Sequence, residues 1–192
     1  GEIRKESKKI EHKNTETKQA FLSSAISDVS SYIHLTDTKV SIIMAIMAAM
    51  IAIITKCYEF IMNQLIMIKP CNVFSVLSVI LLLIFVISFV GVFVFGILTI
   101  KGHQPKLKYN SKWFIAKSVE DYTFEMYKKD VSQMTDADIL ENMAAELYKL
   151  NDINRQKLNL YKWVIRCLSA SAFSIVVLIL LAFLYKYFLA LL

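Results

Sequence analysis

The chain contains few of the residues that interrupt helices or build chemical sites. Its 192 residues include only four Gly, two Pro and three Cys. So few breakers predict long helices and few loops, and three widely spaced Cys without a CxxC pair give no metal or disulfide framework. The three His are scattered, and no HExxH, P-loop, GxGxxG or GxSxG motif occurs. We therefore expect no enzyme activity, no metal and no cofactor.

Charged residues are scarce in three stretches that are long and apolar. The whole chain is 56% apolar and 20% charged, whereas soluble domains are about half apolar and about a quarter charged. A bilayer core ~30 Å thick requires about 20 apolar residues in a helix. Residues 40–66, 70–100 and 163–187 meet this requirement, although Lys56 and Glu59 make the first the weakest. The sequence predicts an all-α integral membrane protein with three transmembrane helices.

Basic residues predict the orientation of these helices. Residues 1–39 contain seven Lys and Arg and residues 101–166 contain twelve, whereas only Lys186 lies near the C-terminus. Because positive residues accumulate on the cytoplasmic side, we expect a cytoplasmic N-terminus and a cytoplasmic insert between the second and third spans. The connection around residues 67–72 and the end of the last span are then outside.

The cytoplasmic segments differ in their apolar patterns. Residues 1–18 mix charges with few apolar positions and predict a flexible tail or a frayed helix, whereas residues 19–39 have the spacing of an amphipathic helix. In the insert, residues 101–162, helix starts are expected at Ser118 and at Thr135, each followed by an acidic residue. The helix that follows Thr135 is expected to continue into the last span.

Asp37 lies directly before the first span, where an acid without a partner is unfavourable. Structural pairing with Lys39 or with a basic residue in the 150s is the preferred interpretation, and contact with a ligand is the alternative. Basic residues near span ends also have an ordinary role, because they set topology and attract anionic headgroups.

Several short motifs occur in an order that resembles a known family. They are TDTKVSII at residues 36–43, Pro105-Lys106, Trp113-Phe114, and LYKLNDINRQK at residues 147–157. Together, over roughly residues 20–175, they resemble the transmembrane effectors of bacterial Pycsar-type antiphage systems. The resemblance implies an inner-membrane protein that senses a cyclic pyrimidine mononucleotide, or alternatively a cyclic oligonucleotide. It would then disrupt the membrane, so that the infected cell dies before phage are released.

A cyclic nucleotide needs positive charge for its phosphate and an aromatic surface for its base. The candidate ligand-binding residues are Asp37, Lys39, Trp113, Phe114, Tyr148, Arg155 and Lys157. Three spans are too few to enclose a pore, so activity predicts a homo-oligomer in the lipid bilayer, and no DNA or RNA partner is expected. The alternatives are a membrane scaffold or a constitutive channel subunit whose cytosolic helices bind a protein partner.

Overall fold

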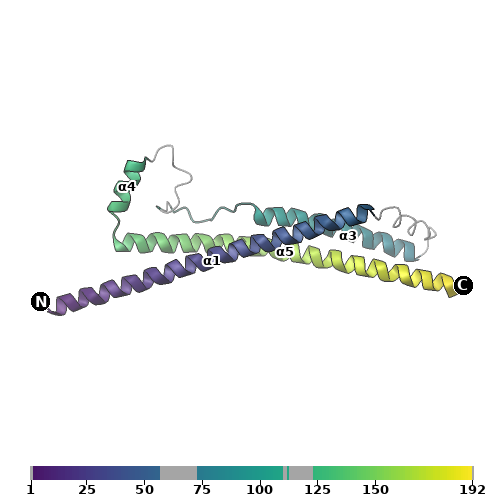
Figure 1. Cartoon of the computed structure of the whole chain (residues 1–192), viewed down its shortest axis with the longest axis horizontal. Helices are drawn as coiled ribbons and strands as arrows, with labels where there is room; N and C mark the ends of the chain where they lie inside the picture. The colour runs from purple at the N-terminus through teal and green to yellow at the C-terminus, as the bar shows by residue number, and fades with distance from the viewer. Residues whose placement is uncertain (1, 57–72, 110–111, 113–122, 192) are drawn as a thin grey trace. The chain divides into compact units, whose positions relative to one another are not determined.

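The computed structural model describes residues 2–56, 73–109, 112 and 123–191, and these residues form four helices and no strand. The helices are α1 (Glu2–Lys56), α3 (Val73–Ile100), α4 (Phe124–Ser132) and α5 (Asp136–Leu191) (Figure 1). The prediction of an all-helical chain is confirmed for this part of the sequence. The predicted helix start at Ser118 and the predicted connection at residues 67–72 lie outside the described residues.

The chain forms two compact units, and α1 and α5 contribute residues to both. The unit that we call the polar unit comprises Gly1–Leu35 and His103–Gln156. The unit that we call the apolar unit comprises Thr36–Gly102 and Lys157–Leu192. Helices α1, α3 and α5 each contain a segment long and apolar enough, by length and composition, to cross a membrane. Residues 57–66 of the first predicted span are not among the described residues.

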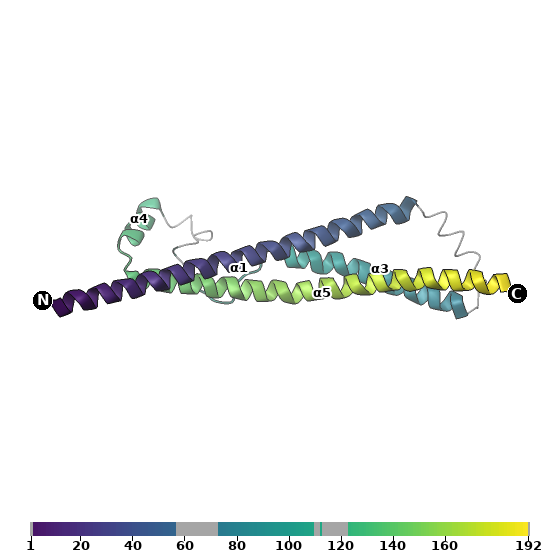
Figure 2. The ribbon, with the colours of Figure 1, turned by 60° about the horizontal axis from the view of Figure 1, so that its bottom comes forward.

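One cluster of buried apolar side chains in the apolar unit takes one residue from each of the three helices. Met47 of α1, Val92 of α3 and Val164 of α5 form this cluster. Figures 1 and 2 show the three helix segments side by side in both views. Within the apolar unit, the buried positions of α5 are separated by seven, seven and three residues: Lys157, Val164, Ser171 and Ser174. This spacing of about 3.5 residues per turn is typical of helices that pack along a shared seam.

Two glycines allow α3 to approach both of its neighbours. A Cβ atom at Gly91 would lie 2.8 Å from Cys167 Sγ of α5, and one at Gly96 would lie 2.7 Å from Met44 Sδ of α1. Positions five apart on a helix are rotated by roughly 140° at 3.6 residues per turn. Gly91 and Gly96 therefore face different helices and do not form one small-residue contact surface.

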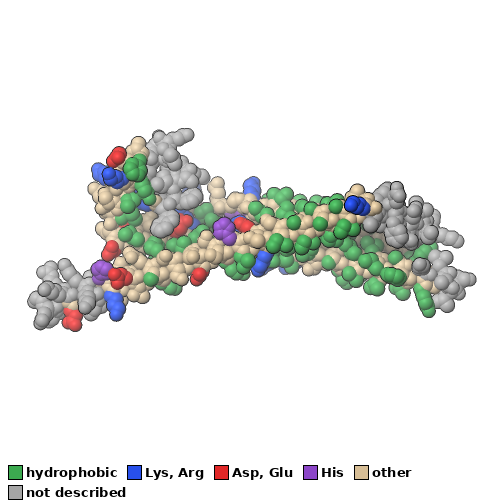
Figure 3. All heavy atoms as spheres, in the orientation of Figure 1, with side chains coloured by type: hydrophobic (Ala, Val, Ile, Leu, Met, Phe, Trp, Pro, Cys, Tyr) green, Lys and Arg blue, Asp and Glu red, His purple; other side chains and the backbone are tan. Residues whose placement is uncertain are grey.

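Most apolar side chains of this unit point away from its core. Exposed examples occur on all three helices, including Ile46, Ile87 and Phe183. Figure 3 shows hydrophobic side chains covering the visible face of α1, α3 and α5 in the apolar unit, with few charged groups among them. Exposing such a surface to water would cost about 25 cal/mol per Å². The arrangement is suited to lipid, as the sequence predicts.

In the polar unit, helix ends are fixed by side chains that cap them. Thr135 and Asp138 form a reciprocal pair at the start of α5: Thr135 N donates to Asp138 Oδ2 at 2.8 Å and Asp138 N donates to Thr135 Oγ1 at 3.3 Å. The predicted helix start at Thr135 is confirmed, as is the continuation of α5 into the last apolar segment. Helix α1 begins at Glu2, so of the two interpretations of residues 1–18 the structure has a helix.

Candidate functional site

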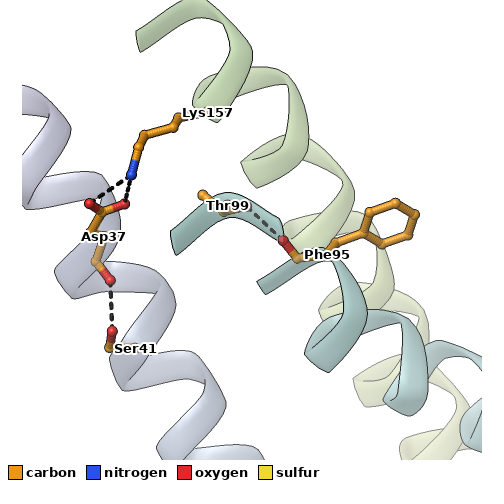
Figure 4. Close-up of polar contacts among 5 residues, drawn as sticks. All are labelled: Asp37, Ser41, Phe95, Thr99 and Lys157. Carbon is orange, nitrogen blue, oxygen red and sulfur yellow. Dashed lines mark hydrogen bonds and ion pairs between the residues drawn. The ribbon is translucent and has the colours of Figure 1, made fainter. Parts of the chain in front are cut away.

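An ion pair joins α1 to α5 in the apolar unit. Lys157 Nζ donates to both carboxylate oxygens of Asp37, at 2.6 and 2.8 Å (Figure 4). The Lys157 side chain is 6% exposed and that of Asp37 is 29% exposed. Asp37 therefore pairs with a basic residue in the 150s, which is one of the two partners expected from the sequence. We call this ion pair the Asp37–Lys157 latch.

Two hydroxyl groups near the latch bond within their own helices. Ser41, one turn after Asp37, donates to the Asp37 backbone carbonyl at 2.9 Å, and Thr99 of α3 likewise donates to Phe95 O at 2.7 Å (Figure 4). Both hydroxyls are thus satisfied within their own helices. Lys39 is exposed. This arrangement can hold α1 and α5 together through one charge-assisted contact.

In the polar unit, the segment after α3 is attached to α5 through backbone groups. We call residues 103–109 together with Lys112 the strap. Lys106 N donates to Asp152 Oδ2 at 3.0 Å, Lys149 Nζ donates to Tyr109 O at 2.8 Å, and Lys112 N donates to Asn142 Oδ1 at 3.0 Å. The strap has no helix or strand of its own, so side chains of α5 satisfy these backbone groups.

A hydrogen bond and burial perturb the pKa values of two titrating groups near the strap. The Lys106 backbone N–H holds the pKa of Asp152 below its ordinary value, with Arg155 and Gln156 acting in the same direction. Burial raises the pKa of Tyr109, and the neighbouring Glu141 carboxylate adds to that rise. Asp152 is buried and stays ionised, so it acts as an anchor for donors and not as a proton carrier at neutral pH.

The remaining predicted ligand residues lie in different places. Tyr148 is 62% exposed on α5, and the Arg155 side chain is 69% exposed and donates to Asp152 Oδ1 at 3.0 Å. Trp113 and Phe114 lie outside the described residues. The contact between Lys106 and Asp152 was not predicted from the sequence, although the Pro105-Lys106 motif includes Lys106. Among the described residues, no cluster of His, Cys, Asp or Glu is arranged to hold a metal ion.

Comparison with known proteins identifies one family. A family model described as the Pycsar effector protein domain matches residues 21–185. The matched range contains every candidate residue described above. No curated protein and no solved structure matches the chain.

Proposed function

Because the chain belongs to the Pycsar effector family, we propose that it is an antiphage effector of the bacterial inner membrane, activated by a cyclic nucleotide. The family match over residues 21–185 carries this proposal and confirms the resemblance drawn from the sequence motifs. Three helices of sufficient length and apolarity supply the means of acting on a membrane. The activity proposed is disruption of that membrane during phage infection, which ends the infection with the death of the cell.

The Asp37–Lys157 latch is the proposed switch. A ligand changes a conformational equilibrium only if it binds the two states with different affinity. In the closed state, Lys157 is buried against Asp37. Ligand binding by the cytoplasmic residues would favour a state in which this contact is broken and α1 and α5 can move. Helix α5 supports such coupling, because it is continuous from Asp136 to Leu191.

The active species is proposed to be a homo-oligomer. In the described part of the apolar unit, the three helices pack against one another around Met47, Val92 and Val164, and one chain of three spans is too thin to enclose a pore. Lipid-facing side chains must therefore be brought together from several copies, or the bilayer itself must be disordered by them. The N-terminus is proposed to be cytoplasmic, with the polar unit on the side where a bacterial cyclase releases its product.

Expression in bacteria with and without a cyclase that makes cyclic CMP or cyclic UMP tests the proposal. We expect a membrane-potential dye to report depolarisation only when effector and active cyclase are present together. A cyclase with an inactivated catalytic site is the matched control. Equal depolarisation with the active and the inactive cyclase would favour a constitutive channel. No depolarisation with an active cyclase of either kind, for cyclic CMP or for cyclic UMP, would contradict the proposed function.

A further inference from the structure

Asp152 brings two basic residues to one place on the polar unit. Its carboxylate accepts a hydrogen bond from Lys106 N at 3.0 Å through Oδ2 and from Arg155 Nη2 at 3.0 Å through Oδ1. Gln156 Nε2 completes the set at 3.1 Å. Asp152 is buried, so these donors, and not water, satisfy most of its capacity. The strap residue Lys106 is thereby fixed beside Arg155 of α5.

These two basic side chains are available to an anion. Lys106 is exposed, and Arg155 is also largely exposed although its Nη2 bonds to Asp152, whereas the Lys157 side chain is buried against Asp37. In the segments 103–108 and 152–156, three basic residues (Lys106, Lys108 and Arg155) stand against one acid, Asp152, which gives a net charge of +2. The Asp152 charge is partly neutralised by its own donors, so the outer surface of this cluster is positive.

An aromatic side chain lies on the same face of α5. Tyr148, Asp152 and Arg155 are spaced i, i+4 and i+7, which places them along one stripe of a helix. The Tyr148 side chain is largely exposed and forms no part of the core. A planar ring beside a guanidinium is the combination that binds a base and a phosphate of one small molecule.

One buried polar atom on the strap, Nδ1 of His103, has no hydrogen-bond partner in the described structure. His103 precedes Lys106 by three residues, which chain geometry limits to roughly 10 Å. Buried polar atoms are normally paired, so a ligand that carries a matching group could pair with this one.

We propose that Lys106, Arg155 and Tyr148 form the nucleotide-binding site, with the phosphate held by the two basic side chains and the base stacked on Tyr148. Asp152 is the positioning residue, because it fixes Lys106 and Arg155 relative to each other. This inference rests on the proposed function and deepens it by assigning the ligand site. The same positive surface could bind the phosphate of an anionic lipid, so the experiment must separate the two sources.

Calorimetry can distinguish nucleotide binding from binding of an anionic lipid. The full-length protein is titrated with cyclic CMP and cyclic UMP in nanodiscs of neutral phosphatidylcholine, which contain no anionic lipid. We expect Lys106→Gln and Arg155→Gln each to weaken binding about tenfold or more, because each removes a charge-assisted contact. Tyr148→Leu should weaken it about fivefold or more through loss of stacking. Lys128→Gln and Phe124→Leu are matched controls on the exposed surface of α4, and binding should stay within about twofold.

The positioning role of Asp152 has its own readout. In Asp152→Ala, hydrogen exchange at the Lys106 amide should rise and nucleotide affinity should fall, whereas Arg155→Gln should lower affinity without changing that exchange. Wild-type affinity in the Lys106 and Arg155 variants would overturn the site but leave the proposed function intact. Variants that lose only binding to phosphatidylglycerol vesicles would identify a lipid site and overturn the inference. A wild type that binds neither nucleotide would overturn the proposed site and activation by a cyclic pyrimidine mononucleotide.

Discussion

The two members of the latch are buried to different extents, so replacing Asp37 and replacing Lys157 should have different effects on stability. The Lys157 side chain is 6% exposed and that of Asp37 is 29% exposed. Asp37→Asn leaves the ammonium buried without a counter-ion, which is unfavourable. Lys157→Met removes the buried charge, keeps a side chain of similar length, and leaves a carboxylate that has access to water. We therefore expect Asp37→Asn to destabilise the closed state more than Lys157→Met does.

The size of the effect follows from the partial burial of the pair. Breaking a fully buried ion pair costs about 3–5 kcal/mol and losing an exposed one about 0–1 kcal/mol. The latch lies between these limits, so we expect about 2–3 kcal/mol for Asp37→Asn and less than about 1 kcal/mol for Lys157→Met. A loss of about 2–3 kcal/mol shifts the closed-to-open equilibrium by about 30- to 150-fold.

Depolarisation of bacteria without any cyclase measures this shift directly. We expect Asp37→Asn to depolarise the membrane without ligand, Lys157→Met to stay near the wild-type baseline, and the double variant to return toward that baseline. The amount of each variant in the membrane fraction must be matched. If Asp37→Asn requires the cyclase as the wild type does and responds to the same extent, the pair does not hold the closed state.

Three further predictions address the packing, the helix start and the strap. Gly96→Val should lower the melting temperature in detergent, through overpacking of about 1–3 kcal/mol against α1, whereas Gly102→Val, with open space around it, should not. Thr135→Ala should cost about 1 kcal/mol and raise hydrogen exchange in the first turn of α5, with no change at the start of α4. The lowered pKa of Asp152 means that its bonds stabilise the fold above 3.8, the ordinary value, and are lost as pH falls through the lower folded value. Protection of the Lys106 amide should therefore persist down to pH 3.8 and be lost only at lower pH in the wild type, and a pH-independent signal in the wild type would contradict this.

The three apolar helices can be predicted from the sequence because each is marked by a continuous run of apolar residues, and no contact with a distant residue is needed to recognise it. Residues 70–100 contain no charge, and Val73–Ile100 is a helix. The first 18 residues are harder, since they lack an apolar stripe and two interpretations fit equally. Their Glu and Lys residues are good helix formers, and adding turns to an existing helix avoids the cost of a new nucleus. Helix α1 accordingly begins at Glu2.

The latch shows which part of the site is readable from sequence. The unfavourable position of Asp37 predicts that it has a basic partner. The sequence offered Lys39 and a basic residue in the 150s. Lys39 is two residues away on the same helix, where side chains do not face each other. Lys157 lies seven residues before Val164 and fourteen before Ser171, on the buried seam of α5. The structure thus selects Lys157 over Arg155, because Lys157 lies on this buried seam whereas Arg155 is exposed.

The contact between Asp152 and the strap could not be predicted in this way. Lys106 and Asp152 are 46 residues apart. The strap has neither a helical nor a strand pattern that would fix its register on α5. Only the tertiary structure shows that a backbone amide, and not the Lys106 side chain, is the group bound by Asp152. The Lys106 side chain consequently stays exposed, which is what makes it a candidate for ligand binding.

The interior of the apolar unit bears on the proposed role of the latch, because it contains polar as well as apolar side chains. Buried polar side chains there are Thr36, Ser78, Thr99, Lys157, Ser171 and Ser174, and buried apolar ones are Val40, Met47, Leu81, Val92 and Val164. Within a bilayer, separating such helices loses little hydrophobic stabilisation, because lipid replaces the apolar contacts. The Ser171 hydroxyl, which lacks a partner among the described residues, would gain one if water entered. We therefore expect close packing at Gly91 and Gly96 and the Asp37–Lys157 latch to carry much of the closed state's stability, and we expect Lys157 left buried without its counter-ion to shift the equilibrium.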